Sequence, residues 1–513
     1  MLKKFIQAGN TSFNHTDVGN AERLVASHGQ DIHWEPRWQR WFCWTGKRWE
    51  IDETGEIERR AKSTIRAIYA EAAALELSIA QTYGDATALK EQAKALRKHA
   101  DKSEQKPRID GLLALAKSEN GVSISYEQLD VDPMLLNTLS GTVDLRSGVV
   151  RPHQRTDMMT KMIAHPFVSI DTPAPLWEQF IDEIMCGDRE MVEFMQMAVG
   201  YALTGCTDEQ CLFLLHGHGS NGKSTFVETI RNLLGDYSQQ ADFSTFLEKE
   251  GDKVRNDVAR MVGARFIAAA EGPEGKRLDE AAVKHLTGSD RVTARFLHRE
   301  YFEFSPTHKI FLATNHKPSI KGVDNGIWRR LRIIPFNAFF SEEKKDPQFP
   351  EKLKAEYPGI LAWAIRGCLA WQKQRLGMPK AVELATAQYR EEMDLIQGFL
   401  NDYCIVGPTH SVKSQQLYDA YRQWAEANGH GVYSQTRFSL TLSEKGIKSK
   451  KTSSAKLWEG IGLMSAMVGM VPLGVTSPSN HLTVQDTYQP TRPTIPTTTS
   501  QKLKLGEELV FGL

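Results

Sequence analysis

The sequence predicts an α/β protein with a parallel sheet at its centre, and two observations indicate this fold. Four continuous apolar runs, separated by helical stretches, lie between residues 211 and 340: CLFLLHG, ARFIAAAE, KIFLATN and RLRIIPF. Strands that are buried on both faces of a parallel sheet have this continuous apolar pattern. The first run leads into the glycine-rich stretch GHGSNGKST and then an amphipathic helix, an order that is typical of a nucleotide-binding core.

The composition limits the number of domains and the kinds of partner. A chain of 513 residues is too long for one hydrophobic core, so we expect several domains. Its 63 basic and 63 acidic residues cancel, so any affinity for nucleic acid must come from local basic patches. The six cysteines form no C-x-x-C pair, which argues against a disulfide framework and a zinc ribbon. The amino terminus has no apolar core of signal-peptide length, and the longest apolar stretch, residues 463–475, is too short to span a bilayer. We therefore expect a cytoplasmic protein without membrane contact.

The region before the predicted sheet divides into three segments. Residues 1–60 carry five tryptophans in alternating runs such as RWFCWTGKRWEID, where T-G-K predicts a hairpin turn in a small β-rich unit. These aromatic side chains could stack on bases, although core packing explains their density more simply. Residues 61–108 predict two helices, broken near Gly84, and then a linker, SEQKPRID. Residues 109–200 predict an α+β region, with short strands in LLNTLSGTVDLRSGVVRPH and helical periodicity from residue 177.

The glycine-rich stretch has the spacing of a phosphate-binding loop. Gly217, Gly222, Lys223 and Ser224 satisfy G-x-x-x-x-G-K-[ST], with a strand before the motif and a helix after it. The glycines let consecutive backbone N–H groups face an anion, Lys223 would reach the β- and γ-phosphates, and Ser224 would hold Mg²⁺. We therefore predict a P-loop NTPase core over residues 201–345. The residues expected to bind ATP are Gly217, His218, Gly219, Ser220, Asn221, Gly222, Lys223, Ser224 and Thr225.

Polar residues end the next two predicted strands. Glu271 ends ARFIAAAE, where a P-loop protein places the carboxylate that holds Mg²⁺ or activates the attacking water. Because Ala270 precedes it, Glu271 would serve both purposes. Asn315 ends KIFLATN, at the edge of a parallel sheet where ligands bind, and its amide would orient water or contact the γ-phosphate. A surface carboxylate and a turn-forming asparagine are the simpler alternatives.

Two adjacent arginines, Arg329 and Arg330, precede the last apolar run. An arginine presented to the nucleotide of a neighbouring subunit would neutralise charge in the transition state. The sequence does not distinguish between the two, and two solvated surface charges are the alternative. The predicted catalytic residues are thus Lys223, Glu271, Asn315, Arg329 and Arg330, and the predicted ligands of Mg²⁺ are Ser224 and Glu271.

The chain after the core predicts a helical region, a DNA-binding domain and a tail. Residues 346–393 show helical periodicity, and residues 394–463 show the order helix, helix, helix, strand, strand, which suggests a winged helix. Six basic residues and one acidic residue lie between residues 437 and 456, and we expect contacts with duplex DNA from Arg437, Lys448, Lys450 and Lys451. A protein-docking domain with a solvated basic edge is the alternative. Residues 464–513 are rich in Thr and Pro and predict a disordered tail.

The order of these motifs resembles the superfamily 3 helicases. GHGSNGKST, Glu271, KHLTGSDRVTARFLHREYFEFSP, LATN and WRRLRIIPF occur as in the carboxyl-terminal part of phage and plasmid primases and of the poxvirus primase-helicase; NTLSGTVDL and MQMAVGYALTG are similar too. The resemblance covers residues 130–345 with specific motifs and the flanks more loosely. It implies an AAA+ core, a hexameric homo-oligomer that hydrolyses ATP, and 3′ to 5′ translocation on single-stranded DNA. It also implies a DNA-binding hairpin, here residues 292–304, in which Arg295, His298 and Arg299 contact phosphates. Lys284 and Arg291 would support this hairpin.

The motifs and the resemblance together predict an AAA+-like P-loop NTPase core with an α+β amino-terminal region and a carboxyl-terminal winged helix. We expect an ATP-dependent DNA helicase of a phage or plasmid replication system, acting on single-stranded and forked DNA in a bacterial cytoplasm. Larger members carry an amino-terminal primase domain, whereas the shared region begins near residue 130 here, so the primase or polymerase would be a separate partner. The alternatives are a ring-forming loader or scaffold without unwinding activity, and a packaging motor, whose nuclease acid cluster the sequence lacks.

Overall fold

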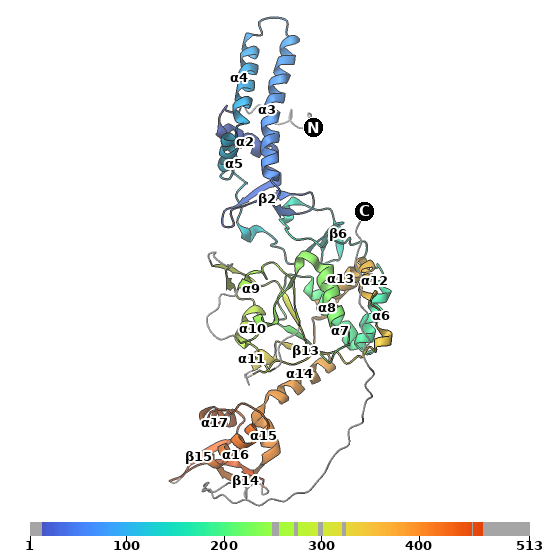
Figure 1. Ribbon diagram of the computed structural model, residues 1–513, viewed down its shortest axis with the longest axis vertical. Coiled ribbons are helices and arrows are strands. Elements are labelled where there is room, and N and C mark those ends of the chain that lie inside the picture. Colours follow the sequence, from blue (N-terminus) through green and yellow to red (C-terminus); the bar gives the residue numbers. More distant parts are fainter. Residues whose placement is uncertain are drawn as a thin grey trace, which may run out of the picture. The chain divides into compact units, whose positions relative to one another are not determined.

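The computed structural model describes residues 13–248, 256–270, 275–295, 301–320, 325–453 and 455–464 of the chain (Figure 1). Contacts between residues divide the chain into two compact units. The first is Met1–Phe399 with Asn428–His430, and the second is Leu400–Ala427 with Gly431–Leu513. Within the described ranges, no helix has both the length and the apolar character that a membrane span requires.

A five-stranded parallel sheet lies at the centre of the first unit. Its order is β13-β7-β12-β9-β8. The strands are β7 (Leu212–His216), β8 (Ser238–Gln240), β9 (Phe266–Ala270), β12 (Lys309–Thr314) and β13 (Leu331–Pro335). Four of them coincide with the predicted apolar runs, so the parallel sheet is confirmed, whereas the short β8 was not predicted. Because the strands are parallel, the residues that follow β7, β9 and β12 lie at one edge of the sheet.

Apolar side chains cover both faces of this sheet. Phe213 and Leu215 of β7 join one core, together with α6 (Pro175–Ile184), α7 (Arg189–Ala202), α8 (Lys223–Leu234) and α13 (Tyr357–Gln374). Leu212 and Leu214 join the core on the other face, together with α10 (Glu280–Leu286) and α14 (Lys380–Met393). In Figure 1, α10 lies on the opposite side of the strands from α7, α8 and α13. Burial on both faces accounts for the continuous apolar runs in the sequence.

Shorter elements complete this part of the first unit. They are α9 (Asn256–Ala259), α11 (Asn325–Trp328), α12 (Phe349–Ala355) and the antiparallel strands β10 (Val292–Ala294) and β11 (Phe302–Phe304). The helical periodicity from residue 177 corresponds to two helices, α6 and α7. The chain turns between them at Cys186 and Gly187, whose φ angles are +55° and +73°.

The amino-terminal strands form the small β-unit that the tryptophans predicted. Strands β1 (Ile32–Glu35), β2 (Arg40–Trp44) and β3 (Trp49–Ile51) make an antiparallel sheet. The turn between β2 and β3 is the predicted T-G-K hairpin: the N–H of Thr45 donates to the carbonyl of Arg48 at 3.0 Å, and Gly46 has a φ of +93°. Trp49 is 1% exposed, as expected of a core residue.

Four helices accompany this sheet, and one of them corrects a prediction. They are α2 (Asp17–His28), α3 (Glu56–Ala80), α4 (Thr87–Ser103) and α5 (Lys106–Ala116). The break between α3 and α4 contains Gly84, as predicted. The segment SEQKPRID is not a linker, because α5 begins at Lys106 with Pro107 in its first turn, a position where proline favours a helix.

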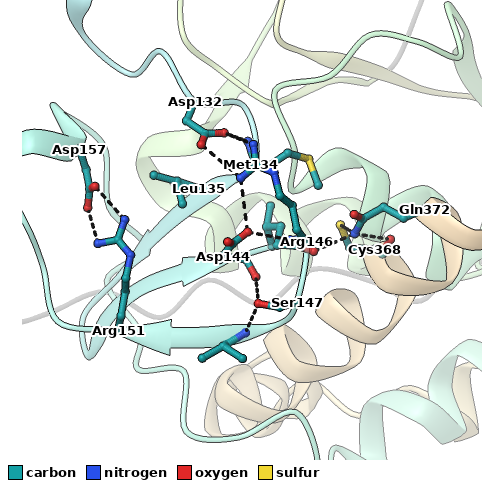
Figure 2. A network of polar contacts seen from close by, with 12 residues as sticks. Asp132, Met134, Leu135, Asp144, Arg146, Ser147, Arg151, Asp157, Cys368 and Gln372 are labelled. Atoms are coloured by element: carbon teal, nitrogen blue, oxygen red, sulfur yellow. Dashed lines mark hydrogen bonds and ion pairs between the residues drawn. The ribbon is translucent and has the colours of Figure 1, made fainter.

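A second small sheet, formed by β4 (Leu135–Thr138), β5 (Gly141–Asp144) and β6 (Val149–Arg151), confirms the short strands predicted for this region. Figure 2 shows the polar contacts around it. Arg146 pairs with Asp132 at 2.9 Å and with Asp144 at 3.4 Å. The side chain of Gln372 on α13 donates to the carbonyl of Leu145 at 2.8 Å, which connects this sheet to the helices of the main core.

In its described residues, the second unit contains three helices and a three-stranded sheet. Its helices are α15 (Leu395–Tyr403, which begins at the end of the first unit), α16 (Ser414–Ala427) and α17 (Gln435–Glu444). Its strands are β14 (Cys404–Lys413), β15 (Lys448–Lys451) and β16 (Lys456–Leu463), in the antiparallel order β14-β16-β15. The three helices and two of the strands were predicted, whereas β14 was missed. The predicted disordered tail lies, from residue 465 on, outside the described residues.

Candidate active site

The loop of residues 217–222 joins β7 to α8 at the carboxyl end of the sheet. Two of its glycines have no room for a side chain. A Cβ on Gly217 would lie 2.3 Å from the carbonyl oxygen of Phe336, and a Cβ on Gly222, whose φ is +85°, would lie 2.5 Å from Cγ2 of Ile184. Gly219 has open space around its Cα. The close packing of this loop therefore explains two of the three glycines.

Asn221 fixes the loop to the segment that follows β13. Its side-chain amide donates to the carbonyl of Phe336 at 3.1 Å, and the residue is 4% exposed. The N–H of Phe336 donates to the carbonyl of His216 at 2.8 Å, and the N–H of Phe340 donates to the carbonyl of Ser220 at 2.8 Å. This support from residues 336–340 was missed in the sequence, because a backbone hydrogen bond carries no signature in residue type.

Lys223 begins α8, and its ammonium group lies inside the loop. The Nζ donates to the carbonyls of Gly217 at 2.6 Å and His218 at 3.3 Å, and to the Oδ1 atoms of Asn221 at 3.1 Å and Asn315 at 3.0 Å. The residue is 6% exposed, and this burial lowers its pKa. Among the residues that the structure describes, no carboxylate pairs with this ammonium group. A buried cation with neutral partners is suited to an anionic ligand, because burying a charge is costly unless an opposite charge compensates it.

Asn315 reaches this loop from a neighbouring strand. It directly follows β12, which pairs with β7 along its whole length, from Ile310 beside Leu212 to Thr314 beside His216. The structure thus brings together two of the predicted catalytic residues. Asn315 is exposed, so its amide is accessible to a ligand in the loop.

The remaining residues predicted to hold nucleotide or metal fall into two groups. His218, Gly219, Ser220 and Ser224 are exposed around the loop, and Thr225 is half-buried in the first turn of α8. Glu271 lies outside the described residues; the residue before it, Ala270, ends β9 beside Ala313 of β12. No group of three or more His, Cys, Asp or Glu side chains that could hold a metal ion occurs within the described ranges.

The two predicted arginines lie at the amino-terminal ends of the parallel strands, whereas the loop lies at their carboxyl ends. They precede β13, whose first residue, Leu331, pairs with Leu212 at the start of β7. A strand of five residues spans roughly 16 Å, so these arginines are remote from the loop of their own chain. Arg330 is half-buried; its guanidinium donates to the carbonyl and the Oε1 of Gln210 at 3.3 and 3.1 Å. Arg329 is exposed.

The strands of the predicted DNA hairpin are present. β10 pairs with β11 from Val292 beside Phe304 to Ala294 beside Phe302. Arg295 follows β10, and its guanidinium carbon lies 4.7 Å from the centre of the Tyr301 ring. The other two predicted DNA contacts in this hairpin, His298 and Arg299, lie outside the described residues.

In the second unit, the predicted basic residues lie on α17 and β15. Lys448, Lys450 and Lys451 are exposed on β15, a strand at the edge of its sheet, and Lys450 pairs with Glu459 of β16 at 3.6 Å. Arg437 of α17 lies with its guanidinium carbon 4.0 Å from the centre of the Tyr433 ring. Three exposed lysines among its four residues give this strand a positive surface. The six cysteines are free thiols in the structure.

Family models match three regions of the chain. The model "D5 N terminal like" matches residues 21–186, a family of unknown function (DUF5906) matches residues 215–330, and "Poxvirus D5 protein-like" matches residues 391–460. The first and third matches lie largely outside residues 130–345, in the flanks for which the sequence motifs indicated a looser resemblance. The middle match contains the loop, Lys223 and Asn315.

Named relatives are viral proteins. "Putative helicase L207/L206" of Acanthamoeba polyphaga mimivirus is 28% identical over 347 residues, which cover 61% of this chain and 36% of the relative. "Primase D5" of fowlpox virus (strain NVSL) is 24% identical over 234 residues, which cover 42% of this chain and 29% of the relative. The chain therefore spans about a third of the length of these relatives.

Among solved structures, the apo form of the NrS-1 C terminal region covers 87% of this chain and 100% of its own, with 8% sequence identity and a TM-score of 0.49. The relatives and the family models agree with the resemblance that the sequence motifs indicated. The "D5 N terminal like" and "Poxvirus D5 protein-like" matches, together with relatives named putative helicase and primase D5, support a primase-helicase family for this chain.

Proposed function

We propose that this chain is the motor of an ATP-dependent DNA helicase in a viral or phage replication system. The observation that carries the proposal is the contact between Lys223 and Asn315 at the carboxyl edge of the sheet. It places a buried ammonium group without a described counter-ion and an exposed amide beside one glycine-rich loop. This arrangement is suited to the terminal phosphates of ATP, and the core would then be an AAA+-like P-loop domain.

The residues present fit a magnesium nucleotide. Exposed Ser224 in the first turn of α8 and Glu271 after β9 are the residues that would hold Mg²⁺. When bound, Mg²⁺ supplies positive charge that the phosphoryl transfer requires. The backbone N–H groups of the loop and the ammonium of Lys223 would bind and orient the phosphates. Asn315 would hold the attacking water in line with the γ-phosphate.

Completion of the site requires a second subunit in this proposal. Arg329 and Arg330 are about the length of a strand away from the loop of their own chain, so a guanidinium would reach a phosphate only across a subunit boundary. Arg329 is exposed, whereas Arg330 already donates to Gln210, and we therefore favour Arg329 as the group that reaches the neighbour. A ring of subunits, six in the related helicases, would give every loop such a partner.

Two surfaces would bind DNA. The hairpin of β10 and β11 would contact the phosphates of single-stranded DNA through Arg295, His298 and Arg299, without reading sequence. The second unit would act as a winged helix, and its exposed lysines on β15 would contact duplex DNA at a fork or an origin.

Strand separation distinguishes a helicase from a loader. The full chain is incubated with ATP, Mg²⁺ and forked DNA that carries either a 3′ or a 5′ single-stranded tail, with Lys223→Ala as the inactive control. We expect unwinding that depends on ATP and on a 3′ tail, and none with Lys223→Ala. Binding of ATP and DNA without strand separation would identify the loader instead, and unwinding that depends on a 5′ tail would contradict the proposed direction.

A further inference from the structure

The hairpin of β10 and β11 is a separate two-stranded sheet. A hairpin of this kind has little stability of its own in water. Among the residues that the structure describes, one edge of β11 has no partner strand, and alternate carbonyls along that edge point away from β10. Two such carbonyls belong to Glu303 of β11 and to Tyr301, directly before the strand; they are two residues apart and so lie on the same edge.

Both carbonyls accept hydrogen bonds from side chains that are distant in sequence. The guanidinium of Arg37 donates to the carbonyl of Tyr301 at 2.9 Å, across 264 residues of sequence. The hydroxyl of Tyr126 donates to the carbonyl of Glu303 at 3.0 Å, across 177 residues. The free edge of β11 is thus satisfied by two side chains of the amino-terminal region instead of by another strand.

The two donors also contact each other. The guanidinium carbon of Arg37 lies 5.5 Å from the centre of the Tyr126 ring, and its Nη1 lies 3.5 Å from the Tyr126 hydroxyl. The ring of Trp38 lies 5.5 Å from the same tyrosine ring, centre to centre. Trp38 therefore has a role besides core packing, since it supports one of the two donors.

The backbones that carry the two donors are joined. Arg37 lies in the turn between β1 and β2, and Tyr126 begins a short 3-10 helix that is closed by a capping box at Ser125. The N–H of Trp34 on β1 donates to the carbonyl of Val122 at 2.8 Å, and the N–H of Ile124 donates to the carbonyl of Trp34 at 2.9 Å. Both donors therefore project from one connected piece of structure.

We propose that Arg37 and Tyr126 are positioning residues that hold β11, and with it the hairpin, against the tryptophan-rich amino-terminal sheet. Arg291, just before β10, adds exposed ion pairs with Glu127 at 3.4 Å and Glu303 at 3.8 Å, which are weak contacts by themselves. The consequence for DNA rests on the proposed function of the hairpin: a hairpin that is held in place presents its basic residues at lower entropic cost.

Two substitutions test this role in the full chain. Tyr126→Phe removes the hydroxyl that reaches Glu303 and keeps the ring, and Arg37→Ala removes the donor to Tyr301. The matched controls are Tyr83→Phe, at a fully exposed tyrosine between α3 and α4, and Arg40→Ala, at an exposed arginine at the start of β2. The measurements are amide hydrogen exchange in peptides covering residues 292–304, the Kd for fluorescent oligo-dT, and the rate of ATP hydrolysis without DNA.

We expect several-fold faster exchange across the hairpin in both variants and several-fold weaker binding of oligo-dT. Hydrolysis without DNA should stay unchanged, and both controls should behave as the unmodified chain. Unchanged exchange in both variants would overturn the positioning role, as would faster exchange throughout the first unit, which indicates general loss of structure. Faster exchange confined to the hairpin with an unchanged Kd would support the positioning role and contradict the hairpin as a DNA contact.

Discussion

The ammonium of Lys223 and the amide oxygen of Asn315 lie 3.0 Å apart, although 92 residues separate them in the chain. The contact exists because β7 and β12 are neighbours and parallel, so that the residues after both strands meet at one edge of the sheet. Four oxygen atoms surround this ammonium group, and three of them belong to the loop itself. Asn315 supplies the fourth from outside the loop. In the proposed function, a phosphate oxygen would replace this amide oxygen as a partner of the ammonium group.

Replacement of Asn315 separates binding from hydrolysis. Asn315→Ala should lower the kcat of ATP hydrolysis by about 10²-fold, the loss seen when one transition-state donor is removed. Nucleotide affinity should change little, because the loop and Lys223 remain. Steady-state hydrolysis and titration with a fluorescent ATP analogue measure the two effects. The same substitution at exposed Asn120 is the control, and an affinity loss as large as the kcat loss would contradict the assigned role.

The glycines of the loop differ in their tolerance of a side chain. Gly217→Ala forces its Cβ to 2.3 Å from the carbonyl oxygen of Phe336, whereas Gly219→Ala meets no atom within 4 Å. The first substitution should destabilise the loop by about 1–3 kcal/mol, as overpacking does, and weaken nucleotide binding by at least tenfold. The second should leave the affinity unchanged within error. Equal affinities for the two variants would show that the loop is not packed as described.

The arginines before β13 should act on a neighbouring subunit. A double Arg329→Ala/Arg330→Ala variant should bind nucleotide normally and hydrolyse it at least 10³-fold more slowly, which is the contribution of such an arginine in other NTPases. Mixing it with a Lys223→Ala variant should restore part of the activity, since mixed assemblies contain some intact pairs of loop and arginine. No recovery in mixtures that still assemble would exclude a shared site.

The single variants identify which arginine contributes. Arg329→Ala should reproduce the loss of hydrolysis without a change in thermal stability, because this side chain is exposed. Arg330→Ala, in contrast, should lower the Tm of the first unit, because it removes the hydrogen bonds to Gln210. A stable Arg330→Ala variant without hydrolysis, beside an active Arg329→Ala variant, would reverse the assignment.

His308 makes stability depend on pH. It is 3% exposed, and burial, with a further contribution from the charge of Lys309, lowers its pKa from 6.5 to about 3. Between these values the unfolded chain binds a proton that the folded chain does not, so the free energy of unfolding falls as the pH falls from 6.5 towards 3, by at most about 1.4 kcal/mol per pH unit. Above pH 6.5 this contribution is fully present.

Urea unfolding of the unmodified chain and of His308→Leu, at pH values from 7.5 to 5, measures this contribution. The variant should show a smaller decrease of stability with falling pH, with the difference confined to values below about 6.5. His285→Leu, at an exposed histidine, controls for the loss of an imidazole elsewhere. Parallel pH profiles for the unmodified chain and His308→Leu would rule out His308 as the source.

The lysines of β15 should determine how salt affects duplex binding. Replacing Lys448, Lys450 and Lys451 by Ala should reduce the slope of log K against log salt concentration by roughly 2–3, about 0.9 for each lost phosphate contact. The loss should be the same for unrelated DNA sequences. A matched triple substitution at the exposed lysines of α4, Lys90, Lys94 and Lys98, changes the net charge equally and should leave the slope unaltered. An equal effect of both triples would indicate a general charge effect.

The parts of the fold that sequence predicted are those whose signal is local. The strands β7, β9, β12 and β13 are apolar runs, and the loop has a fixed spacing, so both were predicted at the observed positions. The strand β14 was missed because CIVGPTHSVK contains glycine and proline, which are rare inside strands. Its edge position and the register shift between Val406 and Ser411 explain why this strand tolerates Pro408.

Long-range pairs left no local signal. SEQKPRID suggested a linker because of its proline and charges, yet Pro107 lies in the first turn of α5. Arg37 and Tyr126 had no motif of their own, because their partners are backbone carbonyls that any residue type supplies. The same reason hides the contact of Asn221 with Phe336. The expected contact between the ends of β7 and β12 was the exception, since parallel pairing alone implies it.

The loop and the arginines lie at opposite ends of the parallel strands. This separation restricts how copies of this chain can complete each other's sites. An isologous pair related by a two-fold axis would complete both of its sites only if the loop and the arginines lay together in the one shared interface. Heterologous contacts, with the front of one copy against the back of the next, satisfy every site once the rotation closes on itself. In an unclosed arc, the subunit at one end would keep an incomplete pocket, so hydrolysis per subunit should rise with the degree of closure.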